Sequence, residues 1–101
     1  MTIKRFIGEP VIIRTYSAGV WFGTLEEKDG NEVILSSGRR LWRWWAKESI
    51  SLSAVAIFGI KSSRSKIAPA VPQVWLEAIE ILPVTEAVAT QLTEVPDAQA
   101  E

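Results

Sequence analysis

The residues best suited to chemistry lie in one short stretch near the middle of the chain, Gly38–Lys47, which reads GRRLWRWWAK. It holds three arginines and three of the five tryptophans. Arginine makes bidentate contacts with phosphate, and tryptophan offers a flat π-face on which a base can stack. Any one tryptophan is more often structural, at a core or a subunit interface, but the cluster with its arginines favours binding. The candidate ligand residues here are Arg39, Arg40, Trp42, Arg43 and Trp44.

Two other segments have side chains that suit a phosphate-bearing ligand. RTYSAG, at Arg14–Gly19, contributes Arg14, Tyr16 and Ser17 beside a glycine turn, although an ordinary hairpin is favoured when this turn is considered alone. KSSRSK, at Lys61–Lys66, has three charges and three hydroxyls, and it contributes Lys61 and Arg64. This composition fits phosphate contacts and a solvated surface loop about equally well.

The residue types that are missing exclude several classes of enzyme. The chain has no cysteine and no histidine, so a cysteine nucleophile, a serine–histidine triad and the usual zinc sites are impossible within it. It has no P-loop and no GxGxxG motif. Glu26, Glu27 and Asp29 cluster at a turn, which is more typical of a solvated hairpin tip than of a cation site. We therefore expect no enzymatic activity, no metal and no cofactor.

The net charge of −1 conceals an uneven distribution along the chain. Residues 36–70 carry seven basic side chains and one acidic, whereas residues 71–101 carry six acidic and no basic. The basic segment could bind an anion while the acidic one steers it, or the two could pair within or between subunits. The composition favours neither reading.

Alternating apolar residues and glycine turns predict a mainly β protein. The strongest local signal is a hairpin, in which Asp29-Gly30-Asn31 joins strands at Val20–Lys28 and Glu32–Ser37. Gly23 in mid-strand predicts a bend or bulge, and Ser37-Gly38 predicts another turn. Ser49–Ile60 is ambiguous, but its small residues and a serine N-cap favour a helix that ends near Gly59. Further strands are predicted at Val11–Ser17, Arg39–Ala46 and Val74–Val84, and a polar basic loop at Lys61–Pro72.

These elements predict one domain, a small SH3-like or Sm-like β-barrel of four or five strands with one short helix, over residues 1–84. The unit Val11–Leu35 also matches the first half of an Sm-like fold in pattern. Residues 85–101 are small, acidic and weakly periodic, and we expect a flexible tail there. A chain of 101 residues cannot easily bury five tryptophans alone, which favours a homo-oligomer.

The segments RTYSAGVW, RRLWRWW and VWLEAIEI, together with SLSAVAIFGIK, resemble a family of small proteins encoded by tailed phages and prophages. The resemblance covers about residues 7–84. It implies a phage setting, in which small proteins serve in counter-defence, host takeover or nucleic-acid handling. By analogy, a compact oligomer could sequester a nucleotide immune signal in pockets between its subunits.

The leading hypothesis is therefore a non-enzymatic oligomeric protein that binds a nucleotide-like ligand and counteracts host defence. The alternatives are a module that binds single-stranded nucleic acid and a protein-interaction module that docks through its tryptophans. The sequence contains no secretory signal and no apolar run long enough to span a bilayer. We expect a cytoplasmic protein, in the host cell if it is phage-encoded, with no membrane partner.

Overall fold

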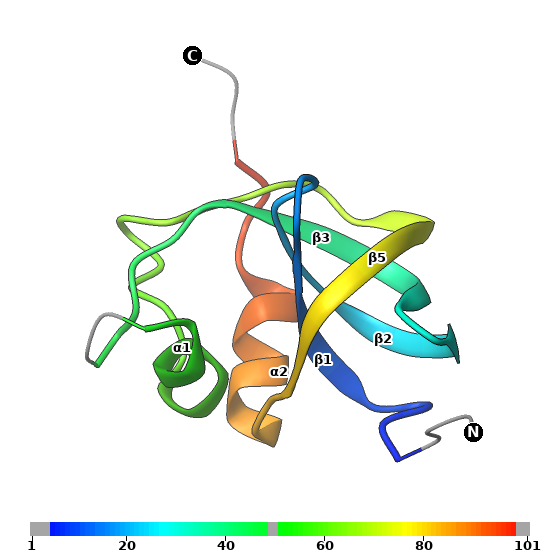
Figure 1. Cartoon of the computed structure of the whole chain (residues 1–101). Helices are drawn as coiled ribbons and strands as arrows, with labels where there is room; N and C mark the ends of the chain where they lie inside the picture. The colour runs from blue at the N-terminus through cyan, green and yellow to red at the C-terminus, as the bar shows by residue number, and fades with distance from the viewer. Residues whose placement is uncertain (1–4, 49–50, 99–101) are drawn as a thin grey trace.

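The computed structural model describes residues 5–48 and 51–98, which form five strands and two helices (Figure 1). In chain order these are β1 (Pro10–Thr15), β2 (Val20–Asp29), β3 (Glu32–Arg43), α1 (Leu52–Phe58), β4 (Lys66–Ile67), β5 (Val71–Pro83) and α2 (Glu86–Glu94). The prediction of a mainly β protein is confirmed. The predicted basic loop is not wholly irregular, because β4 lies within it.

Four of the strands form a ring-like sheet in which every pairing is antiparallel. β1 pairs with β2 and β5, and β3 also pairs with β2 and β5, so the circuit of pairings returns to its start. The short β4 pairs with the end of β3. The predicted hairpin between β2 and β3 is confirmed, and Gly30 takes a positive φ of 58° in its turn.

β3 runs through the position where the sequence predicted a turn. That prediction is wrong, because Ser37 and Gly38 form a bulge in which both residues lie opposite Gly23 of β2. Ser37 adopts a positive φ of 51°, and a Cβ on Gly38 would lie 2.9 Å from Cγ1 of Val74. The predicted irregularity at Gly23 is confirmed by the same register shift. Because the bulge keeps the strand continuous, Arg39–Arg43 extend the ring toward β4 and α1.

Two groups of buried side chains hold the fold together. One comes from all four strands of the ring, and the other lies between the ring and the helices. β1 serves both groups, because Ile13 packs in the first and Ile12 in the second. The first group is Val11, Ile13, Trp21, Leu25, Val33, Leu35, Leu76 and Ala78; the second includes Ile12, Phe22, Leu41, Val55, Ile60, Ile67, Val88 and Leu92.

Helix α1 begins and ends where its capping residues lie. The Ser51 hydroxyl accepts a hydrogen bond from the backbone N–H of Ala54, and Gly59 closes the helix with a φ of 92°. The prediction of a helix that ends near Gly59 is confirmed. The first two residues of that predicted segment, 49 and 50, lie outside the described residues.

The C-terminal segment corrects the sequence prediction most strongly. Residues 85–101 were expected to form a flexible tail, but Glu86–Glu94 form α2, with the Thr85 hydroxyl accepting a hydrogen bond from Val88 N–H. Val88 and Leu92 are buried one helical turn apart in the core. The domain therefore includes this helix; residues 99–101 lie outside the described residues. In residues 5–48 and 51–98, no helix is long and apolar enough to cross a membrane.

Candidate binding site

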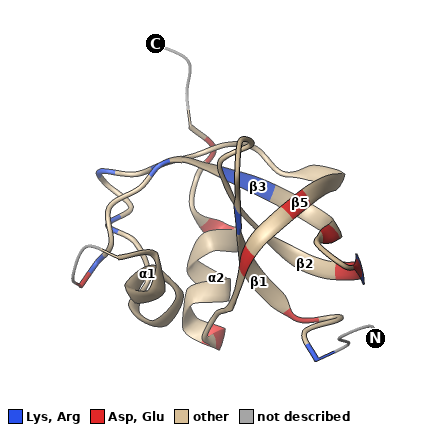
Figure 2. Ribbon diagram, in the orientation of Figure 1, with Lys and Arg blue, Asp and Glu red and all other residues tan. Residues whose placement is uncertain are grey.

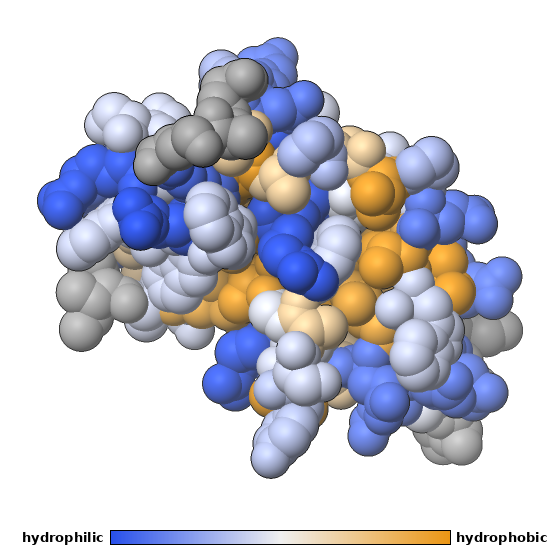
Figure 3. All heavy atoms as spheres, turned by 90° about the horizontal axis from the view of Figure 1, so that it is seen from above, coloured by the Kyte–Doolittle hydropathy of each residue, from blue (hydrophilic) through white to orange (hydrophobic). Residues whose placement is uncertain are grey.

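The basic and aromatic residues of the middle of the chain meet at one end of the molecule. The end of β3 and the connection from α1 to β4 lie side by side there, because β4 pairs with β3 and Ala46 forms a bridge with Ile60 (Figure 1). Arginines and lysines gather at this end (Figure 2). Seen from above, it combines strongly hydrophilic side chains with pale ones of intermediate hydropathy (Figure 3).

An open hollow of about 660 Å³ lies between these two segments. One wall comes from the GRRLWRWWAK stretch and the other from the KSSRSK segment, so the structure brings together two of the three predicted segments. Cations, indole rings and hydroxyls share the lining, and none of the described lining residues is a carboxylate. The lining consists of Arg43, Trp44, Trp45, Ser63, Arg64, Ser65 and Lys66.

The central feature of the hollow is a stack of Arg64 on Trp45. The guanidinium carbon lies 4.0 Å from the centre of the indole ring, within the range of a cation–π contact. Neither Arg64 nor Arg43 donates a side-chain hydrogen bond or forms an ion pair within the described part of the chain. The N–H groups of Arg64 are therefore open to a ligand while its guanidinium lies over the Trp45 ring.

Backbone and hydroxyl contacts hold the α1–β4 connection against the residues that follow β3. Lys61 N–H donates to the Trp45 carbonyl at 2.7 Å, and Trp45 N–H donates to the Ser65 hydroxyl at 3.0 Å. The Ser65 hydroxyl donates in turn to the Lys61 carbonyl at 2.9 Å. These contacts set Arg64 over Trp45, so the hollow has a defined wall rather than a loose loop.

The three tryptophans of the stretch have different environments. Trp42 is 67% exposed on β3, with the Lys66 ammonium 5.6 Å from its ring centre. Trp44 lines the hollow but is half-buried against the helix-facing core. Trp45 is 46% exposed and supplies the open ring of the stack. Trp42 and Trp44 were predicted from the sequence as ligand residues and Trp45 was not; the strand predicted over Arg39–Ala46 ends at Arg43.

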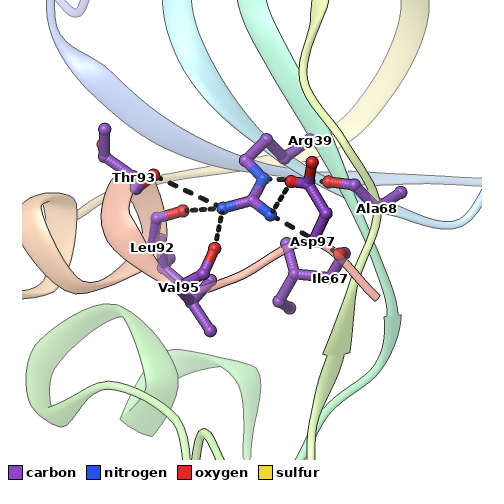
Figure 4. Close-up of polar contacts among 7 residues, drawn as sticks. All are labelled: Arg39, Ile67, Ala68, Leu92, Thr93, Val95 and Asp97. Carbon is purple, nitrogen blue, oxygen red and sulfur yellow. Dashed lines mark hydrogen bonds and ion pairs between the residues drawn. The ribbon is translucent and has the colours of Figure 1, made fainter. Parts of the chain in front are cut away.

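Arg39 is not available to a ligand, so its prediction as a phosphate contact is wrong. It is 4% exposed, and its guanidinium donates to backbone carbonyls at the end of α2 and beside β4 (Figure 4). The shortest of these bonds reach the carbonyls of Val95 at 2.7 Å, Ala68 at 2.8 Å and Leu92 at 3.0 Å. It also forms an ion pair with Asp97 at 2.9 Å. Arg39 therefore caps α2 and ties it to β4.

Two further predicted residues, Arg40 and Lys61, are not among the residues that line the hollow. Arg40 stands over Trp21, with its guanidinium carbon 4.8 Å from the ring centre, and does not line the hollow. Lys61 is exposed at the edge of the hollow.

Arg14, Tyr16 and Ser17 are not part of the hollow. Arg14 pairs with Glu80 at 3.1 Å. Tyr16 is 90% exposed, and with Ser17 it lines a second hollow of about 320 Å³ next to Trp75 and Glu77. That hollow shares no lining residue with the first.

The hollow is also lined by Ser63, Ser65 and Lys66, which were not named individually as candidates from the sequence. The composition of KSSRSK was the signal that could have found them, once its pairing with β3 was known.

Among residues 5–48 and 51–98, no group of carboxylates is arranged to hold a metal ion.

Fold and site together define a small, mainly β protein with a basic, tryptophan-bearing hollow at one end of a ring-like sheet. The chain belongs to the family described as "Domain of unknown function (DUF6948)", whose profile matches residues 8–92. The match extends into α2, which supports including this helix in the domain. No curated protein and no solved structure matches the chain significantly.

Proposed function

We propose that this protein is a non-enzymatic binding protein for a phosphate-bearing ligand that carries an aromatic base, and that the ligand binds in the Trp45–Arg64 hollow. The observation that carries the proposal is the stack itself. A guanidinium placed over an indole ring, with its N–H groups open, supplies both a π surface and phosphate donors. Arg43 and Lys66 add positive charge, and Ser63 adds a hydroxyl donor.

In this proposal each side chain has a distinct role. Arg43 and Arg64 hold the phosphate, and Trp45 stacks with the base, either beside the guanidinium or in its place. Trp44 supports the floor of the hollow, because it packs on the core. We further propose that the ring-like sheet is an SH3-like or Sm-like barrel. Sequestration of a nucleotide immune signal follows from the resemblance to phage proteins alone, and it stays a prediction.

A titration followed by tryptophan fluorescence and by calorimetry tests the proposal. The panel should contain mononucleotides, cyclic mononucleotides and cyclic dinucleotides, together with inorganic phosphate. We expect saturable binding of at least one nucleotide, and affinity about tenfold lower for Trp45→Ala and for Arg64→Ala, since a base–aromatic stack contributes about 1–3 kcal/mol. Phe58→Ala is the matched control, because it removes a similarly exposed aromatic side chain that does not line the hollow. A well-folded protein that binds no member of the panel would refute the proposal.

A second candidate is binding of single-stranded nucleic acid, and one observation favours it. The hollow is open, and Trp42 presents another exposed ring on β3 beyond its lining. Two separated rings with cations between them suit successive bases of a strand. Binding of this kind weakens steeply with salt, so gel shifts with short single-stranded RNA and DNA at low and moderate salt distinguish it from binding of a free nucleotide.

A further inference from the structure

The outer face of the sheet over β2, β3 and β5 carries an acidic and aromatic surface that the proposed function does not use. Cross-strand register places its side chains in two rows. One row is Glu27, Ile34 and Trp75, and the next is Asp29, Glu32 and Glu77. Residues directly opposite each other on neighbouring strands project from the same face, so these six define one surface, which we call the outer face.

The outer face combines exposed apolar area with concentrated negative charge. Trp75 is 53% exposed and lies between two hollows of about 220 and 320 Å³. Its indole N–H donates to a Glu32 carboxylate oxygen at 3.1 Å, which fixes the ring. Glu32 lies directly opposite Glu77 on one side and Asp29 on the other. Like charges placed opposite each other destabilise a sheet, and a cationic partner would relieve that repulsion.

The partner with complementary chemistry is the opposite end of a second copy of this chain. In Figure 2 the acidic residues of the β2–β3 hairpin lie at one end of the molecule and those of β5 lie nearer its middle, whereas the basic residues after β3 and in the α1–β4 connection lie at the other end. The basic end also exposes large apolar side chains, Trp42 and Trp45. Its cations are Arg43, Lys47, Lys61, Arg64 and Lys66.

We propose that the chain associates head to tail, with the basic end of one copy docked on the outer face around Trp75 of the next. Lysine and arginine side chains of the Lys61–Lys66 segment would lie along the carboxylate row, and the exposed tryptophans of both copies would lose their contact with water. Such a contact is heterologous, so it generates a closed ring or an open chain of subunits rather than a two-fold dimer. An interface confined to the ends of so small a domain is weak and sensitive to salt.

Sedimentation velocity over a range of protein concentrations, at low salt and at high salt, measures this association without any ligand. The result is therefore independent of the proposed function. We expect association that grows with concentration at low salt, with an apparent affinity at least about tenfold lower at high salt, because screening shortens the range of the attraction. A protein that stays monomeric at low salt and high concentration would overturn the proposal.

Two double variants then test the geometry. Asp29→Lys with Glu77→Lys changes the charge of the outer face from −4 to 0, and Lys61→Glu with Arg64→Glu changes the five cations of the basic end from +5 to a net +1. Neither should associate alone. Mixed in equal amounts they should form a dimer, because each retains the end that the other has lost. Glu9→Lys with Glu94→Lys is the matched control, since it changes the net charge as much as the first variant at exposed positions outside both surfaces.

The mixture separates head-to-tail contact from other modes of association. A two-fold contact through either surface alone would leave one variant self-associating, and the mixture would restore nothing. Either of those results would overturn the proposal. Circular dichroism of each variant confirms the fold before the comparison is made.

Discussion

Arg39 offers the sharpest test of how this fold is held together, because it is a buried cation whose partners are almost all backbone carbonyls. Its guanidinium joins β3 to the end of α2 through Leu92 and Val95, and to the segment beside β4 through Ala68. Replacing it with methionine keeps an unbranched apolar side chain, shorter than that of arginine, and removes every donor. The carbonyls that it satisfies would then lose their partner in a largely buried setting.

The expected cost follows from these contacts. A hydrogen bond from a charged donor contributes a net of about 1.5–3 kcal/mol, and each buried carbonyl left without its donor costs about 1–3 kcal/mol. Asp97 adds little, because its side chain is 58% exposed and a solvated ion pair is weak. We therefore expect Arg39→Met to lower the free energy of unfolding by about 3–5 kcal/mol, a large share of the total for a domain of this size.

Urea unfolding, followed by tryptophan fluorescence and by far-ultraviolet circular dichroism, measures this change. Arg40→Met is the matched control, since it removes the neighbouring arginine, which is exposed and only stacks on Trp21 at 4.8 Å. That substitution should cost no more than about 1 kcal/mol. Arg39→Lys should fall between the two, because one ammonium cannot reach both α2 and Ala68. If the free energy of unfolding of Arg39→Met lies within about 1 kcal/mol of that of the unmodified protein, the role assigned to Arg39 is wrong.

Three further substitutions test other parts of the fold by the same unfolding measurement. Leu92→Ala should cost about 2–5 kcal/mol, because Leu92 is fully buried, whereas Thr90→Ala on the exposed side of α2 should cost little; equal effects would show that α2 does not pack as described. The Gln91 amide accepts from Ile60 N–H and donates to the Ile60 carbonyl, both at 2.9 Å. Because a carboxylate cannot donate, Gln91→Glu should lower the free energy of unfolding by about 1–3 kcal/mol. A Gln91→Glu variant as stable as the unmodified protein would contradict that pairing. Gly38→Ala should cost about 1–3 kcal/mol, because its Cβ would lie 2.9 Å from Cγ1 of Val74. Gly30→Ala is the comparison: Gly30 has a positive φ, but no atom lies within 4 Å of the new Cβ, so this variant separates the strain of a positive φ from the steric clash.

The strands of the ring could be predicted because their signals are local. The Asp29-Gly30-Asn31 turn and the β-branched run of β1 each specify their element within a few residues. α2 was missed for the opposite reason. Its sequence carries only two local signals, the Thr85 N-cap and two apolar residues one turn apart, and much of what stabilises it comes from distant residues: Arg39 at its end and Ile60 against Gln91. Contacts between residues about 30 and 50 positions apart leave no mark in a local pattern.

The candidate site could be predicted as a region but not residue by residue. Arg39 and Arg40 are adjacent and identical in type, so composition cannot separate the buried one from the exposed one. Alternation could have done so, because Arg39 lies on the same side of β3 as Leu41, which is buried. The same alternation misled beyond Arg43, where β3 ends and Trp45 turns outward.

The buried arginine and the candidate site are connected through β4. Arg39 holds the Ala68 carbonyl, Ala68 N–H donates to the Arg40 carbonyl at 2.9 Å, and β4, which precedes Ala68, begins at Lys66 in the wall of the hollow. The segment that carries Arg64 and Ser65 is therefore anchored on one side to β3 and on the other, through Arg39, to α2. Since the stack of Arg64 on Trp45 depends on where that segment lies, α2 supports the hollow without touching it. A helix that composition alone assigned to a flexible tail is thus part of what positions the proposed ligand site.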